Sequence, residues 1–531
     1  MKVVFSIILS GAKNKIVLSI CFILSISGGF LILYSNSLLG QVFDLDFLRQ
    51  DAADILPSFL LLALLFTLSS SMSILNNYLS EKLKWDCDAK AKEYFVLKLL
   101  KSDNKYFNDK PAPGIWSQLN IATQSAAGAF FIVFGCITYF IRVMFLGFIV
   151  FSVDFYAGIF SILAMPLFFL STKKFGSAFS TLQKDLMDNS RERAIVAQEA
   201  IESVSNIKSK NAYDFFTGRI MKLQYPSAQL MRKISVSHDF LTNIRSLFSV
   251  LAPIIVIFFV IQFSDIDNIG TGDLIVLFIN VPLFVGAFAG FNTSFINYKA
   301  MKPGIEHLKE LDVVPKEPNG DSVINSFEYL ESKDVSVQYG DRIINVPNLR
   351  INKREKVMFM GESGIGKSTL FNIVMGILHE YKGDVVVNGI NLKNIDLSSL
   401  RDVFGIALQS VNIATLTLKD NILLGIKDDF NRIDEIIRLS ELRKQYEEKG
   451  EQVLNANTMS GGEKSRLGLA QLLIRGYDII LIDETFSSVD EDMESLIIER
   501  LFREYPDKTF VCISHRISSK RFFDRVIDFG G

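Results

Sequence analysis

The stretch GESGIGKST, residues 361–369, has the residue types of a loop that binds phosphate. It follows the apolar stretch VMFM, precedes a helical pattern and fits G-x-x-x-x-G-K-[ST]. In such a loop, successive backbone N–H groups surround a phosphate, a lysine reaches the β and γ oxygens, and a serine hydroxyl is placed for Mg²⁺. We therefore predict nucleotide binding along this phosphate loop, which consists of Gly361, Glu362, Ser363, Gly364, Ile365, Gly366, Lys367, Ser368 and Thr369.

A second segment, much further along the chain, also has the means to hold an anion. MSGGE, residues 459–463, stands at the start of a long helical stretch, and we call it the SGG segment. Ser460, Gly461 and Gly462 would expose backbone N–H groups at a helix start with no large side chain in the way. One chain therefore has two predicted phosphate-binding segments, which needs an explanation.

Two adjacent acids follow a short apolar run, IILIDE, at residues 479–484. Such a run is typical of a buried parallel strand, and it places Asp483 and Glu484 at the strand's end. Alone these residues indicate little, but downstream of a phosphate loop they suggest a hydrolytic site. We expect Asp483 to hold Mg²⁺ and Glu484 to orient and deprotonate an attacking water.

The elements that must position these residues follow a strongly apolar N-terminal part. Since a bilayer span needs about 20 mostly apolar residues, each of several charge-free runs can cross a membrane. In the third run, a polar start moves the expected span to between about Gly128 and a point beyond Arg142. We predict an all-α six-helix transmembrane domain over residues 1–305 and a soluble α/β domain over residues 325–531; the alternative is that some runs are core helices of a large soluble protein. The six runs are residues 16–43, 55–80, 111–141, 155–172, 246–264 and 274–298.

The charges between these runs indicate an orientation. Residues 81–110 carry eight Lys, and residues 173–245 carry twelve Lys and Arg. The alternate connections, residues 44–54 and 265–273, together hold one Arg against seven Asp. By the positive-inside rule, the N-terminus and the soluble domain face the cytoplasm of a multi-pass protein in the cytoplasmic (inner) membrane.

Composition suggests few other partners. The net charge of −2 gives no indication of a nucleic-acid partner, and neither the four Cys nor the four His have metal-site spacing. The first apolar stretch is short and a full span follows it, so we do not expect the N-terminus to be cleaved as a signal peptide. No peptidase segment precedes the first run, so we do not expect peptide export coupled to cleavage.

The order of phosphate loop, SGG segment and strand with Asp483–Glu484 resembles the ATP-binding cassette of ABC transporters. In that family two cassettes dock head to tail, and each ATP lies between the phosphate loop of one cassette and the SGG segment of the other. The resemblance implies that the second phosphate-binding segment serves the partner's nucleotide. It extends over essentially the whole chain, because six spans followed by one cassette is the half-transporter layout of the exporter type.

The same resemblance implies roles for further residues. Tyr339 in VQYGD would stack on adenine, and Gln409 in IALQS would contact the metal and γ-phosphate and sense the membrane domain. The loop SSVD, which ends at Asp490, would join the two nucleotide sites. His515 in ISHR would contact the γ-phosphate and hold Glu484 and the water, although a histidine in this place can also be an ordinary surface residue. Residues 105–114 and 205–216 resemble cytoplasmic turns that press on the cassette, or they simply pack helices.

The chain departs from the family pattern in two places that bear on the site. The SGG segment has Met and Glu where Leu and Gln are usual, so Glu463 brings an extra negative charge near a phosphate. The stretch between Gln409 and Ser460 is short, so we expect a trimmed helical subdomain.

The function implied is ATP-driven export of an amphipathic or hydrophobic substrate, with ATP and Mg²⁺ as cofactors. The cargo would be a peptide, a lipid-linked molecule or a drug, and the partners would be the bilayer and a second copy of the chain, or a related half-transporter. A channel or sensor gated by ATP and uptake through the same fold are the alternatives, and the presence of both Glu484 and His515 favours turnover. Arg142, the one charge well inside a span, either contacts an anionic cargo group or extends to the outer interface.

Overall fold

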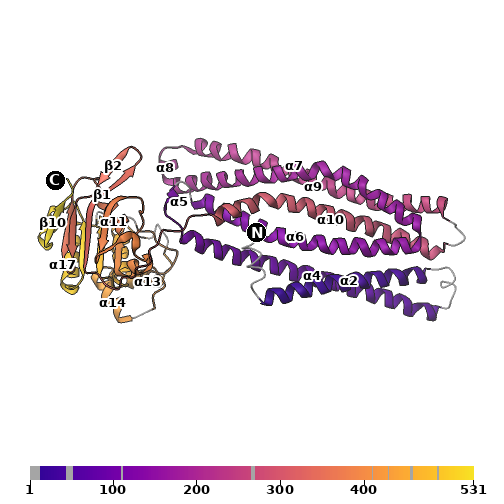
Figure 1. Ribbon diagram of the computed structural model, residues 1–531, viewed down its shortest axis with the longest axis horizontal. Coiled ribbons are helices and arrows are strands. Elements are labelled where there is room, and N and C mark those ends of the chain that lie inside the picture. Colours follow the sequence, from indigo (N-terminus) through magenta and orange to yellow (C-terminus); the bar gives the residue numbers. More distant parts are fainter. Residues whose placement is uncertain are drawn as a thin grey trace. The chain divides into compact units, whose positions relative to one another are not determined.

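The computed structural model describes residues 12–43, 52–108, 112–264, 269–408, 411–427, 430–454, 459–486 and 489–530. The chain divides into two compact units, residues 1–316 and 317–531, and each is described by itself. This division falls between the predicted domain ends at residues 305 and 325. The first unit consists of long helices, and the second combines two sheets with short helices (Figure 1).

Each charge-free run overlaps a different long helix of the first unit. Among the described residues, five of these helices are long and apolar enough to cross a membrane: those covering residues 14–42, 55–100, 113–153, 213–263 and 271–312. The fourth run lies in α7, parts of whose side chains are outside the described residues. The prediction of a helical transmembrane domain is confirmed. Its long helices are α2 (Ala12–Val42), α4 (Ala52–Leu100), α6 (Ala112–Val153), α7 (Phe155–Glu202), α9 (Tyr213–Phe263) and α10 (Thr271–Asp312).

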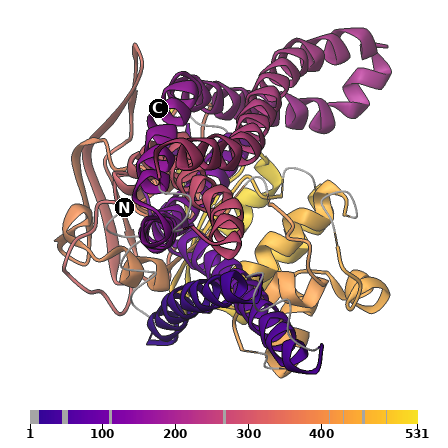
Figure 2. The ribbon, with the colours of Figure 1, turned by 90° about the vertical axis from the view of Figure 1, so that its right-hand side faces the viewer.

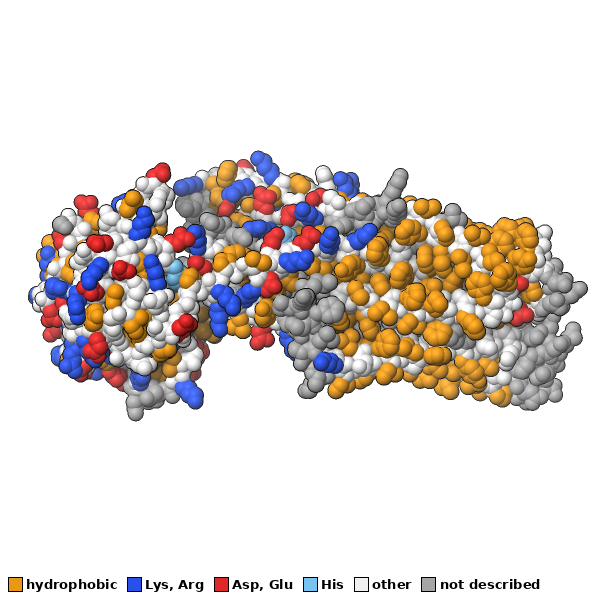
Figure 3. Space-filling view, viewed as in Figure 1, with side chains coloured by type: hydrophobic (Ala, Val, Ile, Leu, Met, Phe, Trp, Pro, Cys, Tyr) orange, Lys and Arg blue, Asp and Glu red, His pale blue; other side chains and the backbone are white. Residues whose placement is uncertain are grey.

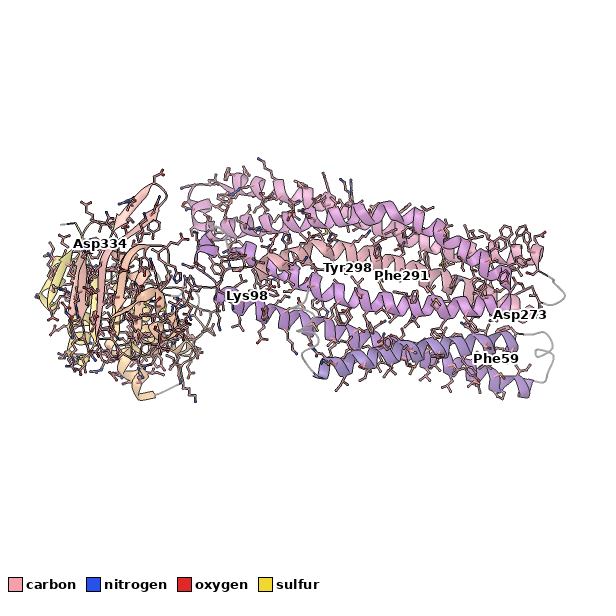
Figure 4. The ribbon with its side chains drawn as sticks, in the orientation of Figure 1. Phe59, Lys98, Asp273, Phe291, Tyr298 and Asp334 are labelled. Atoms are coloured by element: carbon pink, nitrogen blue, oxygen red, sulfur yellow. The ribbon has the colours of Figure 1, made fainter. Side chains whose placement is uncertain are left out.

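The basic stretches between the runs are largely helical rather than looped. α9 has 51 residues and is therefore about 75 Å long at about 1.5 Å per residue, against about 30 Å of bilayer hydrocarbon. Hydrophobic side chains cover one end of this unit, and Lys and Arg gather towards the other (Figure 3). Phe59 and Asp273 lie at the apolar end, and Lys98 lies at the opposite end (Figure 4). Two short helices, α5 (Lys105–Asn108) and α8 (Val204–Ser209), overlap the segments predicted to be cytoplasmic turns.

Small and polar residues let the long helices pack closely. A Cβ at Gly304 of α10 would collide with Ser125 of α6, so these two helices approach along a small-residue contact. α2 is joined to α10 by a buried hydrogen bond in which Asn36 Nδ2 donates to Asn280 Oδ1 at 2.7 Å. Viewed end-on, α2 and α4 lie on one side of the bundle and part of α7 on the other (Figure 2).

The second unit contains an antiparallel and a parallel sheet. The antiparallel sheet has the order β2-β1-β5-β6, with β3 also pairing with β1, and the parallel sheet has the order β10-β4-β9-β8-β7. The antiparallel strands are β1 (Tyr329–Tyr339), β2 (Arg342–Asn345), β3 (Leu349–Asn352), β5 (Lys382–Val387) and β6 (Ile390–Asn391). The parallel strands are β4 (Lys356–Met360), β7 (Phe404–Ala407), β8 (Ile479–Asp483), β9 (Thr509–Ile513) and β10 (Arg525–Asp528).

Burial on both faces explains why the parallel strands other than the edge strand β10 are mostly apolar. In β8, Ile479 and Leu481 belong to the core beneath the antiparallel sheet and α11, whereas Ile480 and Ile482 belong to a second core. This second core is formed with helices, and it includes the short helical subdomain between the phosphate loop and the SGG segment. The helices of the whole second unit are α11 (Lys367–Val374), α12 (Leu397–Val403), α13 (Leu418–Leu423), α14 (Phe430–Leu439), α15 (Arg443–Lys449), α16 (Gly461–Leu473) and α17 (Glu491–Glu504).

Candidate nucleotide site

Three neighbouring strands bring the predicted site residues together. β4, β9 and β8 are adjacent and parallel, so their carboxyl ends meet at one edge of the sheet. The phosphate loop follows β4, His515 follows β9, and Asp483 ends β8 with Glu484 directly after it. Residues that are far apart in the sequence therefore converge where the strand order predicts a ligand site.

Glycine is required in the phosphate loop by the backbone itself. Gly361, Gly364 and Gly366 have φ values of +136°, +78° and +122°, a region that disfavours residues with side chains. A Cβ at Gly366 would also lie 2.8 Å from Ile344 Cγ2. Arg342 fixes the loop from outside, because its Nη2 donates to the carbonyl oxygen of Gly364 at 3.1 Å. The sequence pattern gave no indication of this last contact.

Tyr339, the predicted adenine contact, lies next to this part of the loop. It ends β1, and its partner in the strand register is Arg342 of β2. Its side chain is exposed, as a stacking residue requires.

Lys367 places a buried positive charge inside the loop. Its Nζ donates to the carbonyl oxygens of Gly361 at 2.7 Å and Glu362 at 2.9 Å. Burial lowers the pKa of this ammonium, and the nearby carboxylates Glu484 and Asp483 oppose that shift. Phosphate oxygens would be stronger acceptors for the same ammonium than two neutral carbonyls, so the surroundings fit a polyphosphate.

Ser368 and Asp483 form an oxygen pair of the kind that Mg²⁺ prefers. Ser368 Oγ donates to Asp483 Oδ1 at 2.9 Å across the gap between α11 and β8. Burial raises the pKa of the Asp483 carboxyl, and the hydrogen bond from Ser368 opposes this shift. A hard divalent cation would favour the ionised carboxylate, and a hydroxyl with a carboxylate suits its oxygen coordination. The donor set therefore fits a Mg²⁺–nucleotide complex.

Glu484 and His515 are in contact. His515 Nε2 lies 2.9 Å from Glu484 Oε1. Glu484 has a φ of +44°, an uncommon backbone conformation for a residue with a long side chain. Its N–H donates to the carbonyl oxygen of Ile513 on β9 at 3.2 Å, which ties the turn to the neighbouring strand. Strained backbone of this kind tends to occur where a side chain has a functional direction.

A buried ion pair anchors the segment that carries His515. Arg516 Nη1 donates to Glu494 Oε2 at 2.6 Å, and Arg516 Nη2 donates to the carbonyl oxygen of Val489 at 2.6 Å. Burial raises the pKa of Glu494, and Arg516 opposes that shift. Sequence reasoning missed both residues. The position of Arg516 directly after His515 in ISHR could have indicated a role at the site. No sequence motif pointed to Glu494.

The SGG segment begins α16 as predicted, and its glutamate also caps this helix. Ser460 is the N-cap, and its backbone N–H donates to Glu463 Oε2 at 2.7 Å. Glu463 N in turn donates to Ser460 Oγ at 3.3 Å, which completes a capping box. Burial alone would raise the pKa of Glu463, but hydrogen bonds from Ser460 and Gln445 hold it below its usual value. The pattern S-x-x-E was the overlooked signal for this cap.

The remaining predicted residues are placed less directly. Asp490 is the N-cap of α17, and its Oδ1 accepts from Met493 N at 2.8 Å. Gln409 and residues 487–488 of the SSVD loop lie outside the described residues.

Comparison with known proteins agrees with this arrangement along the chain. The family model for the ABC transporter transmembrane region matches residues 18–288, and the model for the ABC transporter matches residues 344–487. A putative export ATP-binding/permease protein of Rickettsia bellii is 24% identical over 97% of this chain and 92% of its own. The Lactococcin-A transport/processing ATP-binding protein LcnC of Lactococcus lactis is 26% identical over 69% of this chain. This chain spans only about half the length of that relative (52%).

A solved structure has the same fold. It is a bacterial Atm1-family ABC exporter with ATP bound, with a TM-score of 0.84 and 17% identity over 98% of this chain and 94% of that one. A helical transmembrane region and an ATP-binding cassette therefore occur in one chain, in the order predicted. The chain belongs to the ABC transporter family, as a half-transporter with the exporter fold.

Proposed function

We propose that this chain hydrolyses ATP to export an amphipathic or hydrophobic substrate across the cytoplasmic membrane. The observation that carries the proposal is the contact of Glu484 with His515 at the sheet edge where Lys367, Ser368 and Asp483 also meet. A base, a group that holds it, a cation for phosphate and a metal-binding oxygen pair are the parts that phosphoryl transfer to water needs.

Each residue of the site has a task in this scheme. Bound ATP and Mg²⁺ supply the phosphoanhydride and the charge that neutralises it. Lys367 binds the β and γ oxygens, while Ser368 and Asp483, with Gln409, hold the metal. Glu484 accepts the proton of the attacking water at a carboxylate oxygen, and His515 Nε2 keeps the other oxygen in position.

Other residues complete the nucleotide site. Tyr339 stacks on adenine, and Asp490 links the two sites. Ser460, Gly461 and Gly462 serve the nucleotide of a second chain, so the working form is a dimer. A homodimer is the simplest assembly, since this chain carries both halves of the site.

The membrane assignment supports export from the cytoplasm. Both basic connections are separated from the cassette by an even number of predicted spans, so they would lie on the same side of the membrane as the cassette. The positive-inside rule therefore supports ATP hydrolysis on the cytoplasmic side. The names of the relatives, a putative export protein and a transport/processing protein, point in the same direction.

Glu484→Gln is the test. In the purified chain in vesicles, the amide can still hold water but cannot take its proton, so the ATPase rate should fall about 10²–10⁴-fold while ATP still binds. Glu499→Gln, an exposed glutamate on α17, is the matched control and should keep the rate of the unaltered chain. Unaltered hydrolysis in the Glu484 variant would remove the basis of the proposal. Concentrative, ATP-dependent uptake into inside-out vesicles distinguishes a pump from a channel.

A further inference from the structure

A cavity of about 390 Å³ lies within the membrane unit between four of its helices. Residues from α2, α6, α9 and α10 line this partly open cavity, so helices from the beginning, middle and end of the domain contribute to it. The lining residues are Gly29, Ile32, Tyr139, Arg142, Phe145, Leu146, Arg245, Ser249, Pro282, Leu283, Gly286 and Ala287.

Two arginines from different helices face this cavity. Arg142 lies on α6 about three turns before the helix ends at Val153, well inside the apolar part of the unit. Arg245 of α9 directly precedes the charge-free run 246–264. The sequence left open whether Arg142 lines a cavity or extends to the outer interface, and the structure places it in the cavity wall.

Neither arginine is neutralised by the described part of the chain. The cavity lining contains no Asp or Glu, and neither guanidinium has an ion pair or hydrogen bond to another described residue. Arg142 Nε is buried without any hydrogen-bond partner among those residues. Charged side chains at membrane depth are costly, and they usually face a cavity or a partner that compensates them.

The rest of the lining suits an amphiphile. Tyr139 and Ser249 add hydroxyl groups, and glycine leaves room beside the charge: among the described atoms, a Cβ at Gly286 would have only Arg245 Nη2 within 4 Å, at 3.8 Å. The other walls are largely apolar, with Ile32 and Phe145 among them. One part of the cavity can therefore bind a polar headgroup and another a hydrocarbon chain.

We propose that this cavity binds the anionic headgroup of an amphiphile, with Arg142 and Arg245 as its ligands. Guanidinium groups match carboxylates and phosphates with paired hydrogen bonds, and two of them in a cavity with no Asp or Glu among its described lining residues favour an anion over a neutral group. This inference rests on the proposed export function and narrows its cargo to anionic amphiphiles. A bilayer lipid could present the same headgroup chemistry, and the test distinguishes it from a soluble amphiphile.

The test measures binding of a matched pair of fluorescent probes to the full chain. Pyrenebutyrate carries a carboxylate, and pyrenebutanol has the same ring system without the charge. Affinities are measured in nanodiscs of phosphatidylcholine, with protein-free nanodiscs giving the background partition. We expect the acid to bind at least about tenfold more tightly than the alcohol. Equal affinities would overturn the proposal.

Substitutions locate the site. Arg142→Gln and Arg245→Gln should each weaken pyrenebutyrate binding about tenfold or more, and the double variant should lose the preference for the acid. Arg232→Gln, on the same helix α9 but outside the cavity lining, is the matched control and should bind like the unaltered chain. A preference for the acid that persists in a folded double variant would overturn the assignment. If the double variant does not fold, the acid–alcohol comparison in the unaltered chain still decides.

Two further measurements are needed. One distinguishes a lipid headgroup from a soluble amphiphile as the bound anion, and the other distinguishes failure of this inference from failure of the proposed function. Adding phosphatidylglycerol to the nanodiscs weakens pyrenebutyrate binding if the site takes a lipid headgroup, and leaves it unchanged if the site takes only soluble amphiphiles; both support an anion site. Basal ATPase of the unaltered chain reports on the proposed function independently. ATP hydrolysis without a preference for pyrenebutyrate over pyrenebutanol would therefore contradict this inference alone. Anion binding without ATP hydrolysis would count against the proposed function.

Discussion

At the scale of single residues, Lys367 shows how one buried charge prepares the site. Its ammonium is held by the carbonyl oxygens of Gly361 and Glu362, and burial lowers its pKa, so a polyphosphate would be bound by a charge with little competing solvent. The surrounding N–H groups shape the loop but carry no full charge. Affinity for ATP should therefore depend on this side chain.

Lys367→Ala should lower the affinity for ATP, because it removes the counter-charge of the β and γ oxygens. Hydrogen bonds to charged groups contribute about 1.5–3 kcal/mol, so we expect a loss of about tenfold or more, measured by titrating a fluorescent ATP analogue. Lys353→Ala provides the control, since Lys353 pairs with Glu328 on the surface and should not affect binding. An unchanged ATP affinity in the Lys367 variant would contradict the role given to this residue.

Site residues that belong to a sequence motif were predictable. Site residues that only the packing of the fold brings together were not. The phosphate loop, Asp483 and Glu484 have characteristic types at characteristic spacing, and His515 gained meaning from their order. Glu494 lies in the first turn of α17, and its ion pair with Arg516 depends on how α17 packs beside β9. Local sequence does not contain that information.

At the scale of elements, the start of α16 shows how one residue type permits two interpretations. From sequence, Glu463 was an extra charge near a phosphate; in the structure it closes a capping box with Ser460. The cap satisfies N–H groups that the first turn of any helix leaves without partners. It also orients the SGG segment, because the same serine is both N-cap and predicted nucleotide contact.

A pair of substitutions separates the cap from the charge. Glu463→Gln keeps an oxygen that can accept from Ser460 N, so stability and ATPase should stay close to those of the unaltered chain. Glu463→Ala removes the acceptor and should cost about 1 kcal/mol, or about 2–4 °C in the Tm of a domain of 150–250 residues. Thermal unfolding of the cassette transition and ATP titration give both readouts. A large rise in ATP affinity on Glu463→Gln would instead favour charge repulsion.

The long helices were predictable in part. Apolar runs identified them, since hydrocarbon requires a length and a composition that are visible in the sequence. The extension of these helices beyond the membrane was not predictable. For example, α4 continues beyond its apolar run to Leu100 through a stretch rich in charged residues. In the cassette, the order of β4, β9 and β8 depends on contacts between segments far apart in the chain, which apolar stretches alone do not specify.

At the scale of the whole molecule, the two phosphate-binding segments remain to be assigned to one nucleotide or two. The phosphate loop and the SGG segment belong to one cassette, yet the resemblance implies that each ATP uses the loop of one chain and the SGG segment of the other. Such an arrangement would make the second copy part of the catalytic machinery. Mixed dimers can test it, because they place two lesions either in one site or in both.

Two mixed dimers have the same substitutions in different combinations. In the first, one chain carries Lys367→Ala and the other carries Ser460→Arg; in the second, one chain carries both and the other is unaltered. Arginine fills the space that Gly461 and Gly462 leave open, so it should block close approach of another chain. If SGG segments act on the partner's ATP, the first dimer has one damaged site and the second has two.

The first dimer should therefore keep more ATPase activity than the second. With independent sites it should retain about half the activity of the unaltered dimer, and the second should approach the background of a homodimer of the double variant. Coupling between the sites would reduce the difference but not invert it, because an intact site exists only in the first dimer. The reverse order would mean that the SGG segment serves the nucleotide of its own chain, and equal rates would count against a shared site. Activity is measured on dimers purified through two different affinity tags, so that each preparation contains one chain of each kind.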